Sequence, residues 1–263
     1  MSTNKITLPT LGTVVDIETR RRRKAAITRW IAGIMAVSAA VFGLFTSVFG
    51  IVAESQQIHA FHNVVVASLL LVFSAPPAFV IARDPVRSGA GLITLTVLSG
   101  AALLTMAAAL TIDPFTLPFV VLTGVLWIVR PAKGQPKEDE RPSFGQLALV
   151  AVGAIPLIGY AMGQAELQRI LTGDEHSQFF HWVETAFYVT AILLLASASA
   201  LRPRTQRLAG LSAGAGLIIF GLAALILGGY ASAVSAPWAW LAIVGGSAFI
   251  GLVTKEPNRH RAR

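Results

Sequence analysis

The sequence predicts an all-α fold: a polytopic membrane helical bundle of eight transmembrane helices, arranged as two parallel four-helix repeats. Three observations lead to this prediction. Apolar residues make up 54% of the chain and charged residues 13%, with a mean hydropathy of +0.68, which leaves too little polar surface for a soluble protein of this length. The apolar residues form runs long enough to cross hydrocarbon. Short motifs at the ends of these runs recur in the second half of the chain.

Each apolar run is predicted to be a helix rather than a barrel strand. The runs lack the alternation of a barrel strand, and a chain in lipid must satisfy its own backbone hydrogen bonds. The fourth run is the shortest. In chain order the predicted spans cover residues 27–53, 62–82, 89–111, 115–129, 144–162, 179–201, 208–230 and 236–254.

The segments outside the spans are polar and mostly basic. Residues 20–24 form a basic cluster directly before the first span, as in a signal peptide, but that span exceeds the roughly 7 to 15 residues of a signal-peptide apolar region. We therefore expect a retained span. The predicted organisation is a basic tail (1–26), a first membrane repeat (27–130), a linker rich in Pro, Lys and Glu (131–143), a second membrane repeat (144–254) and a second basic tail (255–263).

The positions of the basic residues predict the orientation of the chain. If both termini lie in the cytoplasm, all but one of the 21 basic residues fall on the cytoplasmic side, and only Arg169 lies outside. We expect a multi-pass protein of the cytoplasmic (plasma) membrane whose inner segments contact anionic lipid. The isoelectric point near 10.6 is explained by this topology, so nucleic-acid binding is not expected. The sequence identifies no protein partner.

The repeat is predicted from three pairs of motifs in the same order. Each acidic motif ends a span and is followed by a histidine that opens the next one. Because each repeat has an even number of spans, both would insert with the same polarity, related by a pseudo-two-fold axis along the membrane normal. The paired motifs are 53–56 with 165–168, His62 with His181, and 89–92 with 214–217.

Reactive side chains gather on the predicted outer face. Imidazole with carboxylate is a ligand set suited to Zn, Fe, Mn or Cu(II). Glu184 lies about one turn inside an apolar run, where an ionisable group is costly unless it is paired or faces a wet cavity. We therefore expect a site for a divalent transition metal; the alternative is that these residues only mark the span ends. The candidate ligands are Glu54, His59, His62, Glu166, His176, His181 and Glu184.

Haem b is a second cofactor hypothesis, ranked below the simple metal ion. His62 and His181, on corresponding helices, could supply both axial ligands. However, the outer face offers only Arg169 to pair with the propionates. A cation site therefore fits the sequence better than haem.

Several function classes are excluded or disfavoured. The chain has no cysteine, which excludes disulfides, thiolate ligands and Fe–S clusters. It contains no P-loop or H-E-x-x-H motif, so catalytic residues are unassigned, and the sequence favours a protein that is not an enzyme. Two alternatives to a cation-binding protein stay open: a small-molecule or ion transporter, which the repeated halves would suit, and a membrane sensor or accessory subunit.

Overall fold

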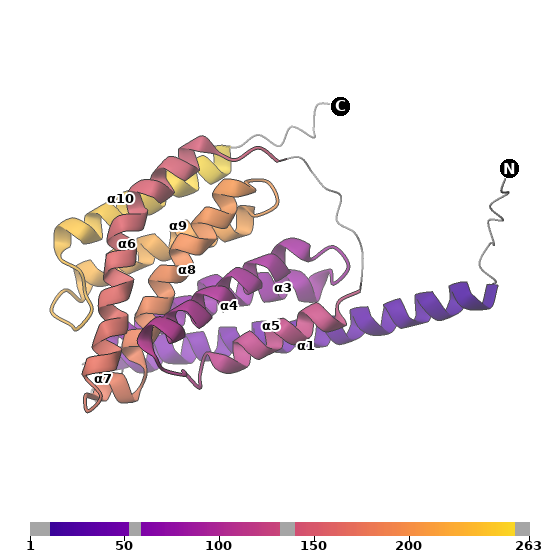
Figure 1. The fold of residues 1–263 in the computed structure, drawn as a ribbon, viewed down its shortest axis with the longest axis horizontal. Helices are drawn as coiled ribbons and strands as arrows, with labels where there is room; N and C mark the ends of the chain where they lie inside the picture. The colour runs from indigo at the N-terminus through magenta and orange to yellow at the C-terminus, as the bar shows by residue number, and fades with distance from the viewer. Residues whose placement is uncertain (1–10, 53–58, 132–139, 256–263) are drawn as a thin grey trace, which may run out of the picture.

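The computed structural model describes residues 11–52, 59–131 and 140–255, and in this part of the chain the regular secondary structure is all helical, without a strand. The predicted all-α class is therefore confirmed. Figure 1 shows the helices as a bundle, with α1 extending beyond it. In chain order they are α1 Leu11–Val52, α2 Ala60–Ser68, the π-helix η2 Leu69–Ser74, α3 Ala75–Arg83, α4 Gly89–Ala109, α5 Leu117–Val129, α6 Phe144–Ile170, α7 Glu175–Gln178, α8 His181–Leu201, α9 Arg207–Ile226 and α10 Ala236–Lys255.

Seven of the helical segments are long and apolar enough to cross a membrane: α1, the continuous segment α2–η2–α3, α4, α6, α8, α9 and α10. The chain is thus a multi-pass membrane protein. The eighth predicted span, residues 115–129, forms α5, which has 13 residues. At about 1.5 Å per residue it is about 20 Å long, shorter than the hydrocarbon core of about 30 Å.

Two helices are longer than the sequence predicted. α1 begins at Leu11 rather than near residue 27, so the basic cluster belongs to the helix. Acidic residues one turn before the arginines account for this extension, because pairs at i and i+4 stabilise an exposed helix: Arg20 pairs with Asp16 at 3.0 Å and Arg22 with Glu18 at 3.1 Å. α6 continues past residue 162 to Ile170, so Glu166 lies inside a helix.

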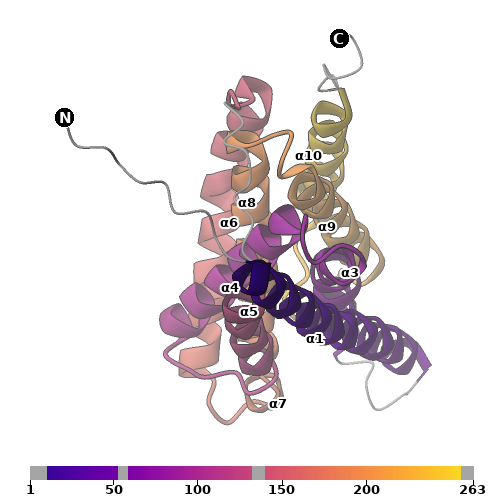
Figure 2. The same ribbon diagram turned by 90° about the vertical axis from the view of Figure 1, so that its right-hand side faces the viewer.

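Antiparallel pairs of helices form the second half of the bundle. α6 packs along α8, and α9 packs along α10; Figure 2 shows the two pairs beside each other, with α1 crossing in front. Glycines allow the close approach of α9 and α10, since a Cβ at Gly214 would lie 2.6 Å from Cγ1 of Ile250. Gly89, in the matching motif, instead begins α4. The two motifs therefore occupy different positions within their helices.

The π-helix η2 is explained by the prolines that follow it. Pro76 has no N–H, so the carbonyl of Val72 loses its usual partner four residues later. Ser212 of α9 donates its hydroxyl to that carbonyl at 2.9 Å, and Ser74 donates to the carbonyl of Leu69 at 2.8 Å. These bonds satisfy backbone groups that lipid could not satisfy, and they join the first half of the chain to the second.

The bundle has two chemically different ends. α7 and the first turns of α2 and α8 form one end, here called the histidine end, at the lower left of Figure 1. The opposite end, here called the basic end, carries Arg83, Arg130 and Arg202, where α3, α5 and α8 finish. At the basic end Nε of Arg29 donates to the carbonyl of Ala82 at 3.3 Å.

Candidate metal centre

Four histidines meet at the histidine end. His59 precedes α2, His62 lies in its first turn, His176 lies in α7 and His181 begins α8. Their ring centroids are 4.5 Å apart for His59 and His181, 4.7 Å for His59 and His176, 4.9 Å for His62 and His181, and 5.0 Å for His62 and His176. Here they are called the histidine cluster. All four are among the ligands predicted from the sequence.

The spacing of the ring nitrogens suits a metal ion. His59, His62 and His181 each offer a nitrogen, and these three atoms lie within 4.8 Å of one another. Two nitrogens bound to the same zinc ion, each at about 2.0–2.1 Å, are at most about 4.2 Å apart. Small rotations of the rings would therefore bring the three nitrogens to bonding distance.

The tautomer of His62 is assigned by a chain of hydrogen bonds. The hydroxyl of Ser232 donates to Oε1 of Gln164 at 2.6 Å and also lies 3.1 Å from Nε2 of His62. Because the hydroxyl has a single proton, it must accept at His62, and Nε2 must carry hydrogen. Nδ1 of His62 therefore has a free lone pair. This is the state in which histidine binds a metal.

His176 is also held at one ring nitrogen, but at Nδ1 rather than at Nε2 as in His62. Its Nδ1 lies 3.2 Å from Oδ2 of Asp174, the same oxygen that accepts from the backbone N–H of His176 and from Nε1 of Trp182. A carboxylate that holds one ring nitrogen of a histidine is typical of metal sites, where it fixes the orientation of the ring. Nε2 of His176 is left free to bind a metal.

A second carboxylate lies beside His59. The ring of His59 is 1% exposed, and its Nε2 is 3.4 Å from Oε1 of Glu175. This contact lacks hydrogen-bond geometry, so it positions the ring less tightly than Asp174 positions His176. His181 completes the cluster from the first residue of α8. Its ring stacks on that of His62 with an angle of 13° between the planes.

Each histidine has a buried ring nitrogen without a partner. Within the described part of the chain, no hydrogen bond reaches Nδ1 of His59, Nδ1 of His62, Nε2 of His176 or Nδ1 of His181. A buried polar atom without a partner is costly, and few occur in a folded protein. Four such atoms in neighbouring rings have a common explanation if they are ligands of one bound ion.

The three predicted acidic ligands differ in where they lie relative to the histidine cluster. Glu184 is buried, with 9% exposure, and lines a cavity together with His181. Glu166 is exposed on α6, because Gln164 and Gln168, two positions before and after it, occupy the buried face of that helix. Glu54 lies outside the described residues.

The residues that hold the histidines were not among the ligands predicted from the sequence. Asp174 and Glu175 directly precede His176, and this short spacing is a signal that could have linked them to the site. Ser232 gives no such signal, because it is 170 residues from His62. It also has φ of 66°, which is unusual for a residue other than glycine.

Haem b does not suit this geometry. Two axial histidines place the iron and the porphyrin plane between their ring nitrogens. Here the rings of His62 and His181 stack face to face with centroids 4.9 Å apart, and ring lone pairs lie in the ring planes. The stacked pair therefore leaves no space for a porphyrin between the two rings.

Comparison with known proteins adds no family to this description. No family model matches the chain, and no curated protein or solved structure matches it either.

Proposed function

We propose that this integral membrane protein binds a divalent transition-metal ion through the histidine cluster. His59, His62 and His181 supply the three closest nitrogens, and His176 supplies the fourth. The observation that carries the proposal is that each of the four rings has at least one buried nitrogen without a hydrogen-bond partner among the described residues. Oxygen atoms of Ser232 and Asp174 engage the other ring nitrogens of His62 and His176, which supports the tautomers that a metal requires.

The donor set favours zinc, copper, iron or nickel over harder cations. Imidazole nitrogen suits these metals, whereas calcium and magnesium prefer oxygen ligands. Four protein ligands would close the coordination sphere, as in structural zinc sites. The ion would then join α2, α7 and α8 at one end of the bundle. We therefore assign the metal a binding and stabilising role and no reaction.

We further propose that the histidine end faces the outside of the plasma membrane. The basic end carries the arginines that the positive-inside rule places in the cytoplasm, and both chain termini would lie on that side, next to anionic lipid. The eight-span arrangement in two repeats is part of the same proposal. The contact of His62 with His181, each at the start of a helix that leaves the histidine end, supports it.

Metal analysis of purified protein tests the function. The wild type, purified without chelator, should retain a stoichiometric amount of one transition metal by mass spectrometry. A variant with both His62→Ala and His181→Ala should lose it while eluting as the same species in size-exclusion chromatography. Wild-type protein that neither retains nor rebinds zinc, copper, iron or nickel would refute the proposal and favour the sensor or transporter alternatives.

A further inference from the structure

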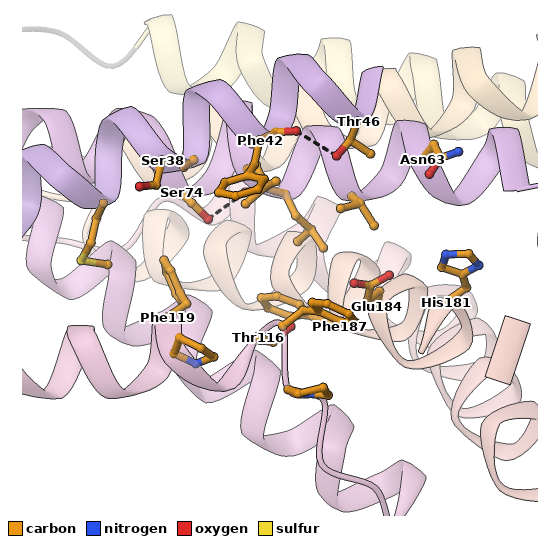
Figure 3. A pocket seen from close by; sticks show the side chains of 18 of the residues that line it. Ser38, Phe42, Thr46, Asn63, Ser74, Thr116, Phe119, His181, Glu184 and Phe187 are labelled. Atoms are coloured by element: carbon orange, nitrogen blue, oxygen red, sulfur yellow. Dashed lines mark hydrogen bonds between the residues drawn. The ribbon is translucent and has the colours of Figure 1, made fainter. Parts of the chain in front are cut away.

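A cavity of about 550 Å³ lies inside the bundle, next to the histidine cluster. Its walls come from α1, α2–η2, α5 and α8, and from the segment before α5. Figure 3 shows it extending along α1 from Phe119 to His181. The volume is within the range of about 300–1,000 Å³ that is typical of sites for small molecules.

Most of the cavity is apolar. Met35, Phe42, Leu70, Leu122 and Phe187 line it. Hydroxyl groups in the same walls are already occupied: Thr46 donates to the carbonyl of Phe42 at 2.8 Å, and Ser74 donates to that of Leu69 at 2.8 Å. This part of the cavity therefore offers hydrocarbon contacts and few polar ones.

One end of the cavity is polar. Glu184, His181 and Asn63 lie there together in Figure 3. No hydrogen bond joins the carboxyl group of Glu184 to any described residue, although the side chain is only 9% exposed. Nδ2 of Asn63 is also buried and, among the described residues, without a partner. These groups require a hydrogen-bonding partner that the described residues do not provide.

The cavity meets the lipid-facing surface between α1 and α5. Phe42 of α1 is 62% exposed and Phe115, just before α5, is 68% exposed; both also line the cavity. In a membrane such residues face acyl chains. A molecule from the bilayer could therefore enter sideways, with its chain among the apolar walls and its polar group at Glu184.

We propose that this cavity binds a long-chain amphiphile with an uncharged hydroxylated head, which hydrogen-bonds Glu184 and Asn63 while its chain extends toward Phe119. A hydroxyl group both donates and accepts, so it matches the carboxyl group and the amide together. A charged head of either sign costs more to bring through hydrocarbon than an uncharged one. This site goes beyond the proposed metal binding and does not depend on it.

Photolabelling of the full-length protein in nanodiscs tests the proposal. The probe is a 16-carbon alcohol that carries a diazirine near the end of its chain. We expect labelled peptides from α1 and α5, and competition by unlabelled hexadecanol. Palmitate and hexadecylammonium, which have the same chain length and charged heads, should compete at least about tenfold less well, because a charged head costs more to bring through hydrocarbon than a hydroxyl group does. Equal competition by either charged analogue would overturn the assignment of the head group.

Three variants and one control locate the site. Glu184→Leu should reduce labelling about tenfold, and Glu184→Gln, which keeps the shape and the hydrogen bonding, should reduce it less. Ala39→Phe, at a buried lining position of α1, should block labelling by filling the cavity. Val244→Phe, at a position of α10 that is 62% exposed, should leave it unchanged. Labelling that survives Ala39→Phe would overturn the proposal.

The metal content of the same samples separates this inference from the proposed function. Glu184→Leu and Ala39→Phe should retain the metal that the wild type holds, which also shows that the histidine end is folded. If the wild type binds metal but its labelling is diffuse along the lipid-facing helices, the amphiphile site is wrong and the metal site stands. If labelling is specific and no metal binds, the metal site is wrong and the amphiphile site stands.

Discussion

Nε2 of His62 lies 3.1 Å from the hydroxyl oxygen of Ser232, a residue in the connection between α9 and α10. The same hydroxyl donates to Gln164 near the end of α6, and the carbonyl of Ser232 accepts from the hydroxyl of Tyr160 at 2.5 Å. Residues of α6 and of the connection between α9 and α10 thus determine which nitrogen of His62 is free. This relationship makes a test of the metal centre possible without removing a ligand.

We expect Ser232→Gly to weaken metal binding about 10- to 100-fold, the usual effect of losing a group that orients a ligand. Glycine adopts the φ of 66° without strain, so the variant removes the hydroxyl and keeps the backbone. Titration of the metal-free protein with zinc, against a competing chelator, measures the effect. Unchanged affinity would mean that the tautomer of His62 is set by something else, or that His62 is not a ligand.

The ligand assignment predicts opposite results for two residues that were both predicted as metal ligands from the sequence. His62→Ala should abolish stoichiometric metal binding, whereas Glu166→Gln should leave it unchanged, because Glu166 is exposed on the far side of α6 from Gln164. Metal content of the two purified variants, with the wild type beside them, gives the answer. Loss of metal in Glu166→Gln would restore the shared acid site that the sequence suggested.

The all-α class and seven of the spans could be predicted from the sequence because hydropathy is a local property. Runs of apolar residues identify spans without knowledge of their neighbours, and seven of them form helices of spanning length. The ends of the helices were less well predicted. α1 begins at Leu11 because pairs such as Asp16 with Arg20 stabilise a helix outside the apolar run, a contribution that hydropathy does not measure.

The proximity of two histidines in the candidate site could be predicted from the sequence, for a related reason. Histidines at the starts of two spans must lie near one end of the bundle, so His62 and His181 could be paired from topology alone. Packing between helices determines which residues of a helix are buried. Gln164 and Gln168 lie on the buried face of α6, so Glu166 is exposed. Ser232 contacts His62 from a connection whose position no local sequence pattern predicts.

Packing between α9 and α2–η2–α3 predicts a difference between two glycines. A Cβ at Gly216 would lie 2.3 Å from the ring of Phe73, whereas nothing lies within 4 Å of a Cβ at Gly100. We expect Gly216→Ala to lower the free energy of unfolding by about 1–3 kcal/mol, as overpacking does. Gly100→Ala should not lower it. Thermal denaturation in detergent compares them, and equal melting temperatures would contradict the packing described here.

The hydroxyl of Ser212 has a specific partner in the carbonyl of Val72, which Pro76 deprives of a backbone donor. Ser212→Ala should therefore destabilise the protein by about 0.6 kcal/mol, the average measured for such bonds between membrane helices, and by at most about 1.7 kcal/mol. Ser247→Ala is the matched control, because Ser247 is exposed and bonds only a carbonyl of its own helix. If both variants melt alike, the carbonyl of Val72 does not depend on Ser212.

The natural absence of cysteine allows the orientation to be tested with single-cysteine variants. Thr172→Cys places a thiol in the exposed connection between α6 and α7, at the histidine end, and Thr254→Cys places one on an exposed position at the end of α10, at the basic end. Because arginines and lysines are retained on the cytoplasmic side, a membrane-impermeant maleimide should label only Thr172→Cys in intact cells. It should label both variants once the cells are lysed. Labelling of Thr254→Cys alone in intact cells would reverse the orientation and place the histidine cluster in the cytoplasm, where its metal would come from the intracellular pool.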